Sequence, residues 1–519
     1  MPLPSGNVTW PPTQLNAITP RLTEWSAWYS GNSDLLTAAY GGNNGTATPR
    51  PSQLAGGIVG RLARMFWGTP TTPGQQRTKL HVPIAADIAT ASSDLLFGEE
   101  VTLITEDKDK TIRERLDVIL EENSFPSLLL EAGEIGSALG GVYLRVTWDE
   151  ALGRFPIITA VHADAAWPEF SFGRLVAVTF WQVISQDNSG HMLRHLERHE
   201  KGRIEHGLYQ GTRENLGTRI PLTESTATAD LTVDEFSGIN TGYDKLTAEY
   251  FPNMKPNRLW RSDPVGACLG RSDFDGVEPL MDSLDETYTS WMRDIRLGKG
   301  RVLVPNYMLN TGGVGGGASF NLDQEVFSGL SIPPSETGST PQITLQQFKI
   351  RHEEHSATSQ DLLARIISSA GYSLQTFGMG GDGVAATATE VNAREKKSMT
   401  TREKKTRYWG KGIANIIEAV LAVDKDKFNG TGVLRPKVEF SPTSQPSIGE
   451  TSTAVQALRI AEAASTETLV KMIHPDWDQT AVGDEVGKIL AEKGVTVPDP
   501  ASPQGFDQIP PGGASTGVN

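Results

Sequence analysis

The chain has 519 residues, with 47 lysines and arginines against 62 aspartates and glutamates, so its formal net charge is −15. Its hydrophobic fraction of 38%, together with 53 glycines, is that of a globular protein and excludes wholesale disorder. A single cysteine, Cys268, excludes an intramolecular disulfide framework and a cysteine-based zinc site. The acidic balance argues against nonspecific coating of DNA but leaves room for a local basic patch.

The N-terminal region predicts an extended arm. Residues 1–50 are rich in Pro, Gly, Asn and Thr, with one short helix expected from Pro20 to Tyr29. Three tryptophans in this arm suggest that it docks on its own domain or on a neighbour. The first residues have neither a basic start nor an apolar run, and no stretch approaches 18 apolar residues. We therefore expect no signal peptide and no membrane-spanning helix.

Residues 51–270 are expected to contain a mixed α/β domain, best defined over 78–260. Apolar residues at helical spacing between Ile84 and Leu95 predict a helix that Gly98 ends. Alternating and β-branched patterns predict strands further on, with a hairpin turn at Lys201-Gly202. The further elements expected here are helices at 112–123 and 127–139 and strands at 101–105, 142–148, 157–160, 175–184, 192–199 and 203–209.

Long helices dominate the second half. One apolar stripe, which includes Tyr288 and Trp291, predicts a helix over 276–297. A strand at 301–305 opens a small loop-rich module, and a second helix is expected over 346–369. A glycine-rich loop at 377–383 precedes a third helix from about 387 to 423. The remaining expected elements are a strand at 433–440, helices at 451–473 and 478–493, and a disordered tail at 496–519.

The third long helix carries the strongest local signal. Between Glu390 and Lys411 there are eight cations and three anions, an asymmetry in an acidic chain. At 100° per residue, five of the cations fall within about 120° of arc. They form the predicted basic face: Arg394, Lys397, Lys404, Lys405 and Lys411. Such a face is either a solvated surface with salt bridges or a surface that meets phosphates.

Other polar patterns predict neither a metal site nor catalysis. On a strand, His195 and His199 share one exposed face but lie about 13 Å apart, too far for a single ion. The loop at 377–383 lacks the Gly-Lys-Ser/Thr ending of a phosphate-binding loop. Adjacent carboxylates such as Glu99 and Glu100 point apart. We therefore expect no catalytic residue, no metal and no cofactor.

The order of elements, together with several short strings, resembles the portal proteins of tailed bacteriophages, of the SPP1-like type found in phages of actinobacteria. The resemblance covers about residues 50–495. The strings that carry it are LHVPIA (80–85), LLFGE (95–99), ALGGVYL (138–144), SDFDGV (272–277), TATEV (387–391) and YW (408–409).

The resemblance implies a non-enzymatic ring, commonly of twelve subunits, at one capsid vertex of the virion, with assembly in the host cytoplasm. Double-stranded DNA would pass through its channel during packaging and ejection. Its implied partners are terminase, a head–tail connector, the major capsid protein and scaffold. The resemblance implies no membrane contact. Another virion structural protein, such as a connector or capsid subunit, and a phage nucleic-acid enzyme remain the alternatives. Clustered metal ligands, which such an enzyme requires, are not found in the sequence.

The family architecture implied is a portal-type α+β fold. In family terms, its parts are an N-terminal arm (1–50), an α/β wing (51–270), a stem helix (271–298), a clip (299–345), a second stem helix (346–370), a tunnel loop (371–389), a long channel helix with a strand (390–450), a helical crown (451–495) and a disordered tail (496–519). We expect Tyr288 and Trp291 to pack between subunits.

The tunnel loop departs from family members whose DNA-contacting loops carry lysines. Residues 371–389 contain no Lys or Arg. If this loop touches DNA, it does so through aromatic, methionine and glycine residues, and the electrostatic contact falls to the helix that follows. The expected loop residues are Tyr372, Phe377, Gly378, Met379, Gly380, Gly381, Asp382 and Gly383.

Overall fold

The computed structural model divides into two compact units, described separately below. The large unit comprises Met1–Ala385 and Val391–Thr443, and the small unit Ala386–Glu390 and Ser444–Asn519. The structure describes residues 2–32, 34–36, 80–106, 109–149, 152–234, 237–298, 301–305, 328–330, 344–346, 350–379, 388–441, 448–474, 477 and 479–492. Among these, no helix combines the length and apolar character needed to cross a membrane.

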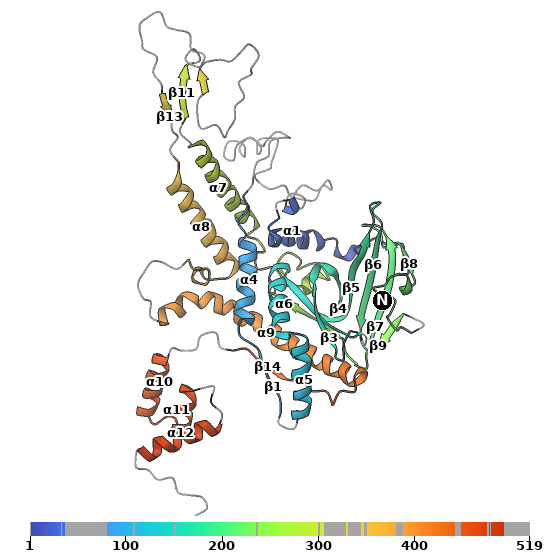
Figure 1. Cartoon of the computed structure of the whole chain (residues 1–519), viewed down its shortest axis with the longest axis vertical. Helices are drawn as coiled ribbons and strands as arrows, with labels where there is room; N and C mark the ends of the chain where they lie inside the picture. Colours follow the sequence, from blue (N-terminus) through green and yellow to red (C-terminus); the bar gives the residue numbers. More distant parts are fainter. Residues whose placement is uncertain are drawn as a thin grey trace, which may run out of the picture. The chain divides into compact units, whose positions relative to one another are not determined.

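Two antiparallel sheets form most of the β part of the large unit (Figure 1). The strands predicted from alternation are confirmed, and β6 and β7 are joined at the expected Lys201-Gly202 turn. The six-stranded sheet contains β4 (Ala166–Ser171), β5 (Arg174–Gln186), β6 (Met192–Glu200), β7 (Arg203–Gly211), β8 (Thr218–Ile220) and β9 (Gly238–Asn240). The three-stranded sheet has the order β10 (Ala248–Pro252), β2 (Gly141–Thr147) and β3 (Ile157–His162).

Helices cover the three-stranded sheet and form the main core. The apolar face of α6 packs on α4 and on β2, and α1 joins the same layer. Trp25 and Trp28 of α1 are fully buried there, so the aromatic arm docks on its own domain. The helix expected at 20–29 is confirmed with one extra residue at each end. The helices are α1 (Thr19–Ser30), α4 (Ile84–Phe97), α5 (Lys110–Glu122) and α6 (Phe125–Leu139).

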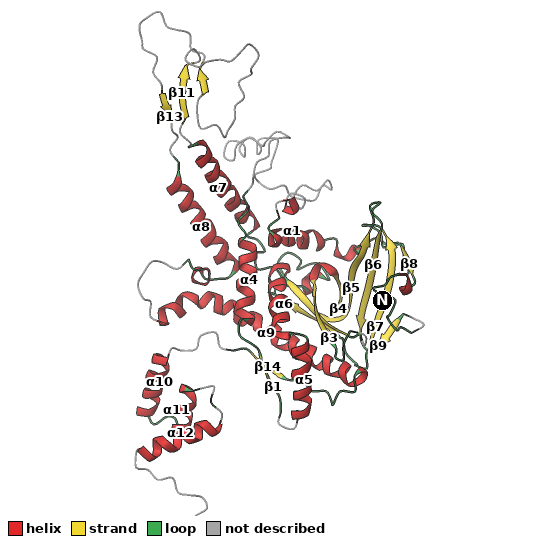
Figure 2. Cartoon of the chain, in the orientation of Figure 1, coloured by secondary structure: helices red, strands yellow, loops and turns green. Residues whose placement is uncertain are grey.

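A helix pair with a small sheet leads away from this core. Helices α7 (Glu278–Leu297) and α8 (His352–Ala370) pack side by side (Figures 1 and 2). Between them in sequence lie β11 (Arg301–Pro305), β12 (Ser328–Leu330) and β13 (Thr344–Gln346), which form one sheet. The second helix was expected to begin at 346, which is wrong, because that segment pairs with β11 as a strand and α8 begins at His352.

The long helix α9 (Ala388–Lys427) packs into the core of the large unit, and most residues of its C-terminal half are buried. After it, β14 (Lys437–Glu439) pairs with β1 (Thr102–Ile104). The small unit contains α10 (Ile448–Ile460), α11 (Thr466–Ile473) and α12 (Gln479–Glu492), three helices where two were expected. Short 3-10 helices are η1 (Thr13–Leu15), η4 (Ala163–Ala165), η5 (Leu222–Glu224), η6 (Gly266–Cys268) and η8 (Leu374–Phe377).

Close packing of α9 on the sheet depends on Gly412. A Cβ at this position would lie 2.3 Å from the ring of Phe251, whereas a Cβ at Gly410 would lie 3.6 Å from Phe440. We expect Gly412→Ala to lower the free energy of unfolding by about 1–3 kcal/mol through overpacking. Gly410→Ala, the matched control, should raise it by about 0.5–1 kcal/mol through helix propensity. Urea unfolding followed by tryptophan fluorescence measures both, and equal effects would contradict the close approach.

Candidate functional site

A buried ion pair joins the helix pair, the sheet layer and α9. Lys405 of α9 donates to the carboxylate of Asp273, which precedes α7, and both side chains are 1% exposed. Lys405 also donates to the hydroxyl of Ser92 on α4 at 2.6 Å. Ser137 on α6 and Tyr372, just after α8, each donate to Asp273 at 2.6 Å. We call these five residues the charge node.

The charge node keeps Asp273 ionised. Burial by itself raises the pKa of this carboxyl group, but Lys405, Ser137 and Tyr372 together hold the pKa below its ordinary value. Asn253 adds a hydrogen bond of 2.8 Å to the other carboxylate oxygen. The node therefore fixes five separate segments of chain around one satisfied negative charge.

Two sequence expectations are corrected by the node. Lys405 was placed on the exposed basic face, but it is buried, because it shares an inward row with Thr401 and Trp409, four residues to either side. Tyr372 was expected in the tunnel loop, in contact with DNA. It is 2% exposed, and its hydroxyl donates to Asp273, so this hydrogen bond holds the chain just after α8 against the core.

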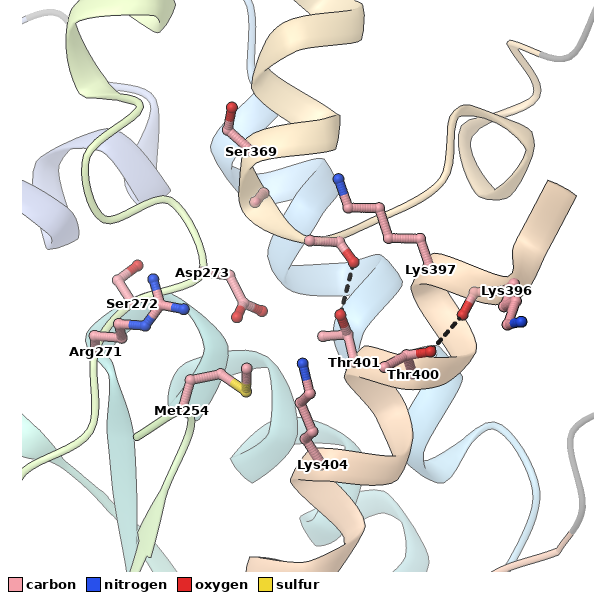
Figure 3. A pocket seen from close by; sticks show the side chains of 12 residues that line it. Met254, Arg271, Ser272, Asp273, Ser369, Lys396, Lys397, Thr400, Thr401 and Lys404 are labelled. Atoms are coloured by element: carbon pink, nitrogen blue, oxygen red, sulfur yellow. Dashed lines mark hydrogen bonds between the residues drawn. The ribbon is translucent and has the colours of Figure 1, made fainter. Parts of the chain in front are cut away.

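Beside the node, a cleft of about 460 Å³ opens between the N-terminal half of α9 and the end of α8 (Figure 3). Its charged lining is four cations and Asp273, whose charge Lys405 neutralises. The four cations are Arg271, Lys396, Lys397 and Lys404. We call this the basic cleft, and it can accept an anionic group.

Hydrogen bonds preset the walls of the basic cleft. Lys397 donates to the carbonyl and the hydroxyl of Ser368 in the last turn of α8, where a cation also complements the helix dipole. Thr401 donates to the carbonyl oxygen of Gly371 at 2.6 Å. Figure 3 shows Lys404 rising from α9 into the cleft. The Nε atom of Arg271 is buried and has no partner within the described part of the chain.

The remaining loop and helix residues fall into three groups. Phe377 and Met379 are half-buried against the core of their own chain, and Gly378 between them is exposed with a positive φ of 69°. Lys411 is exposed but lies outside the lining of the basic cleft, near Glu249. The residues Gly380, Gly381, Asp382 and Gly383, and the side chain of Arg394, lie outside the described residues.

Aromatic and charged contacts join α7 to α8 within one chain. Trp291 stacks on His355, with ring centroids 6.1 Å apart and planes at 11°, and meets His352 edge-on at 5.3 Å. Tyr288 lies 5.9 Å from Trp291, and both rings are half-buried. One turn further on, Asp294 accepts hydrogen bonds from Arg351 and contacts His355. Sequence periodicity indicated the stripe but not its partners on α8.

A histidine cluster in the six-stranded sheet was missed by sequence reasoning. His199 is fully buried rather than exposed. His195 instead meets His206 from the neighbouring strand, with Nε2 and Nδ1 3.1 Å apart. The contact could have been predicted from the alternation of β6 and β7 around the Lys201-Gly202 turn, since a hairpin turn determines which residues face each other across the two strands.

Solved structures of gene transfer agent particles are similar to this chain. The neck of an empty particle, computed with C6 symmetry, has 12% sequence identity and a TM-score of 0.41. The neck of a native particle, computed with C12 symmetry, has 11% identity and a TM-score of 0.38, and the native virion 12% and 0.36. Each similarity covers 80% of this chain and 99% of the other. No curated protein sequence matches the chain.

One protein family matches almost the entire sequence. The family described as "Phage portal protein, SPP1 Gp6-like" matches residues 12–498. The match includes the charge node, the basic cleft, the α7–α8 pair and the three helices of the small unit. It also agrees with the mixed helix and sheet composition of the fold. The chain therefore belongs to the SPP1 Gp6-like family of phage portal proteins.

Proposed function

We propose that this portal protein forms a closed homo-oligomeric ring of twelve subunits at one vertex of the virion capsid, and that genomic double-stranded DNA is packaged and ejected through its channel. The observation that carries the proposal is the family match across residues 12–498. The ring works as a structural element and not as an enzyme. Its partners are terminase, a head–tail connector, the major capsid protein and scaffold, and assembly takes place in the host cytoplasm.

The proposed division of labour follows the folded segments. The sheets and helices of 51–270 act as the wing, α7 and α8 as the stem, and 299–345, which contains β11, β12 and all but the last residue of β13, as the clip. Residues 371–389 form the tunnel loop, 390–450 the channel helix with its strand, and 451–495 the crown. The packing of α7 on α8, with a small sheet connecting them in sequence, supports the stem and clip assignment.

The basic cleft is the proposed electrostatic contact with the DNA backbone. It lies where α8 ends and the tunnel loop begins, and its three lysines are on the helix that follows the loop. The loop itself carries no cation. A ring with a strongly acidic total charge repels DNA over most of its surface. A small number of cations in each subunit would then attract the duplex locally, and the surrounding repulsion would keep the DNA free to slide.

Neutralising the cleft is expected to change the salt dependence of DNA binding. Each phosphate contact contributes about 0.9 to the slope of log affinity against log salt concentration. Changing Lys396, Lys397 and Lys404 to Gln should flatten the slope for a short duplex by up to about 2.7 per cleft that contacts DNA. The control is Lys425→Gln, an exposed lysine about 30 Å further along α9. An unchanged slope in the triple variant would remove the cleft from the DNA path.

Negative-stain microscopy of the purified chain tests the proposed function directly. Rings with a central hole are the expected result, and a DNA-packaging assay with terminase and procapsids then tests the role of the channel. Compact monomers or flat arrays under all assembly conditions, scaffold included, would favour a connector or capsid subunit. Metal-dependent cleavage of DNA by the purified chain would favour a nucleic-acid enzyme.

A further inference from the structure

Three side chains that are common metal ligands converge on one face of the six-stranded sheet. The ligand atoms of His195, Glu197 and His206 all lie within 4.8 Å of one another. His206 and Glu197 are 4% and 7% exposed, and His195 is half-buried. This cluster belongs to the β4–β9 sheet and shares no residue with the basic cleft or the charge node.

The register of the β6–β7 hairpin produces this convergence. Glu197 on β6 is directly opposite His206 on β7, and His195 lies two residues before Glu197 on the same face. Directly opposed residues have Cβ atoms only about 5 Å apart, so both neighbours of Glu197 are within reach of one ion. His199 is on this face as well, but it bonds Glu197 from the far side, Nε2 to Oε1 at 2.6 Å.

The donor types and the distance between the two histidines fit a small transition-metal ion. Two imidazoles and one carboxylate are a donor set that zinc accepts, with a fourth position left for water. In a tetrahedral site with bonds of about 2.0–2.1 Å, two ligand nitrogens are about 3.3 Å apart. The contact between His195 Nε2 and His206 Nδ1 is 3.1 Å.

The surroundings hold the carboxylate in place and leave an entry path. Arg145 donates to Oε2 of Glu197 at 2.7 Å, and Thr247 contacts Nδ1 of His199 at 2.7 Å. A carboxylate has about four lone-pair positions, so these bonds leave positions free for an ion. His195, Glu197 and Arg145 line a cleft of about 390 Å³ that also contains Asp164, through which an ion and its water can enter.

We propose that His195, Glu197 and His206 bind one divalent transition-metal ion, of the zinc class, on the β6–β7 hairpin. Binding requires both histidines to turn their lone pairs from their mutual contact toward the ion, with the ring protons on Nδ1 of His195 and Nε2 of His206. His199 and Arg145 act as outer-shell partners of Glu197, which orient it. The ion ties β6 to β7 at the centre of the sheet.

Metal titration of the full chain, purified without a histidine tag, tests this proposal. The untagged protein is freed of metal by a chelator, dialysed, and titrated with Zn²⁺ by calorimetry at pH 7.5. Co²⁺ provides an independent readout, because a tetrahedral site gives intense visible absorption bands. We expect one ion per chain. His206→Gln and His195→Gln should each weaken binding by more than about 100-fold, beyond the range of an outer-shell partner.

The controls distinguish the cluster from other histidines. His191→Gln is the matched control, because His191 sits in the turn before β6, in an exposed contact with Asp187. It should bind the metal with unchanged affinity. Circular dichroism checks that each variant is folded, and His195→Gln, at the half-buried rim, tests the site if His206→Gln unfolds. Absence of stoichiometric binding by the wild-type chain, or equal binding by the His195 and His191 variants, overturns the proposal.

Discussion

Lys405→Met is expected to lower the free energy of unfolding of the large unit by about 3–5 kcal/mol. The substitution keeps the length of the side chain but leaves the carboxylate of Asp273 without its cation, and this carboxylate is 1% exposed. Three neutral hydrogen-bond donors remain, which lessens the desolvation cost without replacing a charge. Urea unfolding followed by the fluorescence of buried tryptophans such as Trp409 measures the loss.

The neighbouring lysine is the matched control for this variant. Lys404→Met changes the same side-chain chemistry one residue away, at an exposed position, and should alter the free energy of unfolding by less than about 0.5 kcal/mol. Adding Asp273→Asn to Lys405→Met removes the stranded charge, so the double variant should be less destabilised than the sum of the single variants. Equal losses for the two methionine variants, or strict additivity in the double, would contradict the node.

The charge node is expected to make the free energy of unfolding decrease as the pH falls into the acid range. The pKa of Asp273 is lower in the folded chain than the ordinary carboxyl value of about 3.9. Its ionised form therefore contributes stability above that ordinary value, and the contribution is lost as the pH falls through the lower folded-state pKa. The Asp273→Asn variant lacks this contribution, so its stability should fall less steeply in that acid range than that of the wild type.

Periodicity predicted the elements of this fold because most of them bury one face. The apolar spacing in α4 and α6 and the alternation in β6 and β7 were sufficient to place those elements to within a few residues. The start of α8 was missed because the preceding residues pair with β11, a long-range contact that a local pattern does not contain. The two helices expected after 450 proved to be three for the related reason that a turn at residues 461–464 separates α10 from α11.

The residues of the candidate sites were harder to predict from the sequence, because the charge of a side chain does not indicate whether it is buried. Lys404 and Lys405 are adjacent and chemically identical, yet one lines the basic cleft and the other pairs with Asp273, 132 positions earlier in the chain. The helical arc used to group the cations was wide enough to include both an exposed and an inward position. Likewise, His195 and His199 were compared along one strand, whereas the partner of His195 lies across the hairpin.

The basic cleft and the charge node meet at Asp273, which lines one and anchors the other. In the proposed ring, a tunnel loop that begins at the end of α8 is thereby attached to the core through Tyr372. In this proposal, any movement of the loop during DNA passage would pivot beyond Met379, because Phe377 and Met379 also pack against the core and Thr376 bonds Ser398 of α9. The buried ion pair of the charge node supplies the anchor.

Trp291→Asp is expected to abolish ring formation while leaving the core of the large unit folded. In one chain Trp291 covers the histidines of α8 but stays half-buried, so part of its ring is available to a neighbouring subunit. An aspartate there would lie one turn before Asp294 and repel its like charge. It would also place an unpaired carboxylate in the proposed contact between subunits. A cost of about 3 kcal/mol per subunit contact weakens each contact by more than 100-fold.

Light scattering after size-exclusion chromatography, together with negative-stain images, measures the fraction of chains in rings. Trp291→Phe is the matched control, because it retains an aromatic ring between Tyr288 and the histidines of α8 and should assemble close to wild-type yield. Circular dichroism and the buried-tryptophan fluorescence of the aspartate variant should remain those of a folded chain, since α1 and α9 do not depend on this contact. Rings at normal yield in Trp291→Asp would show that α7 does not form the seam between subunits, and the stem assignment would fall with it.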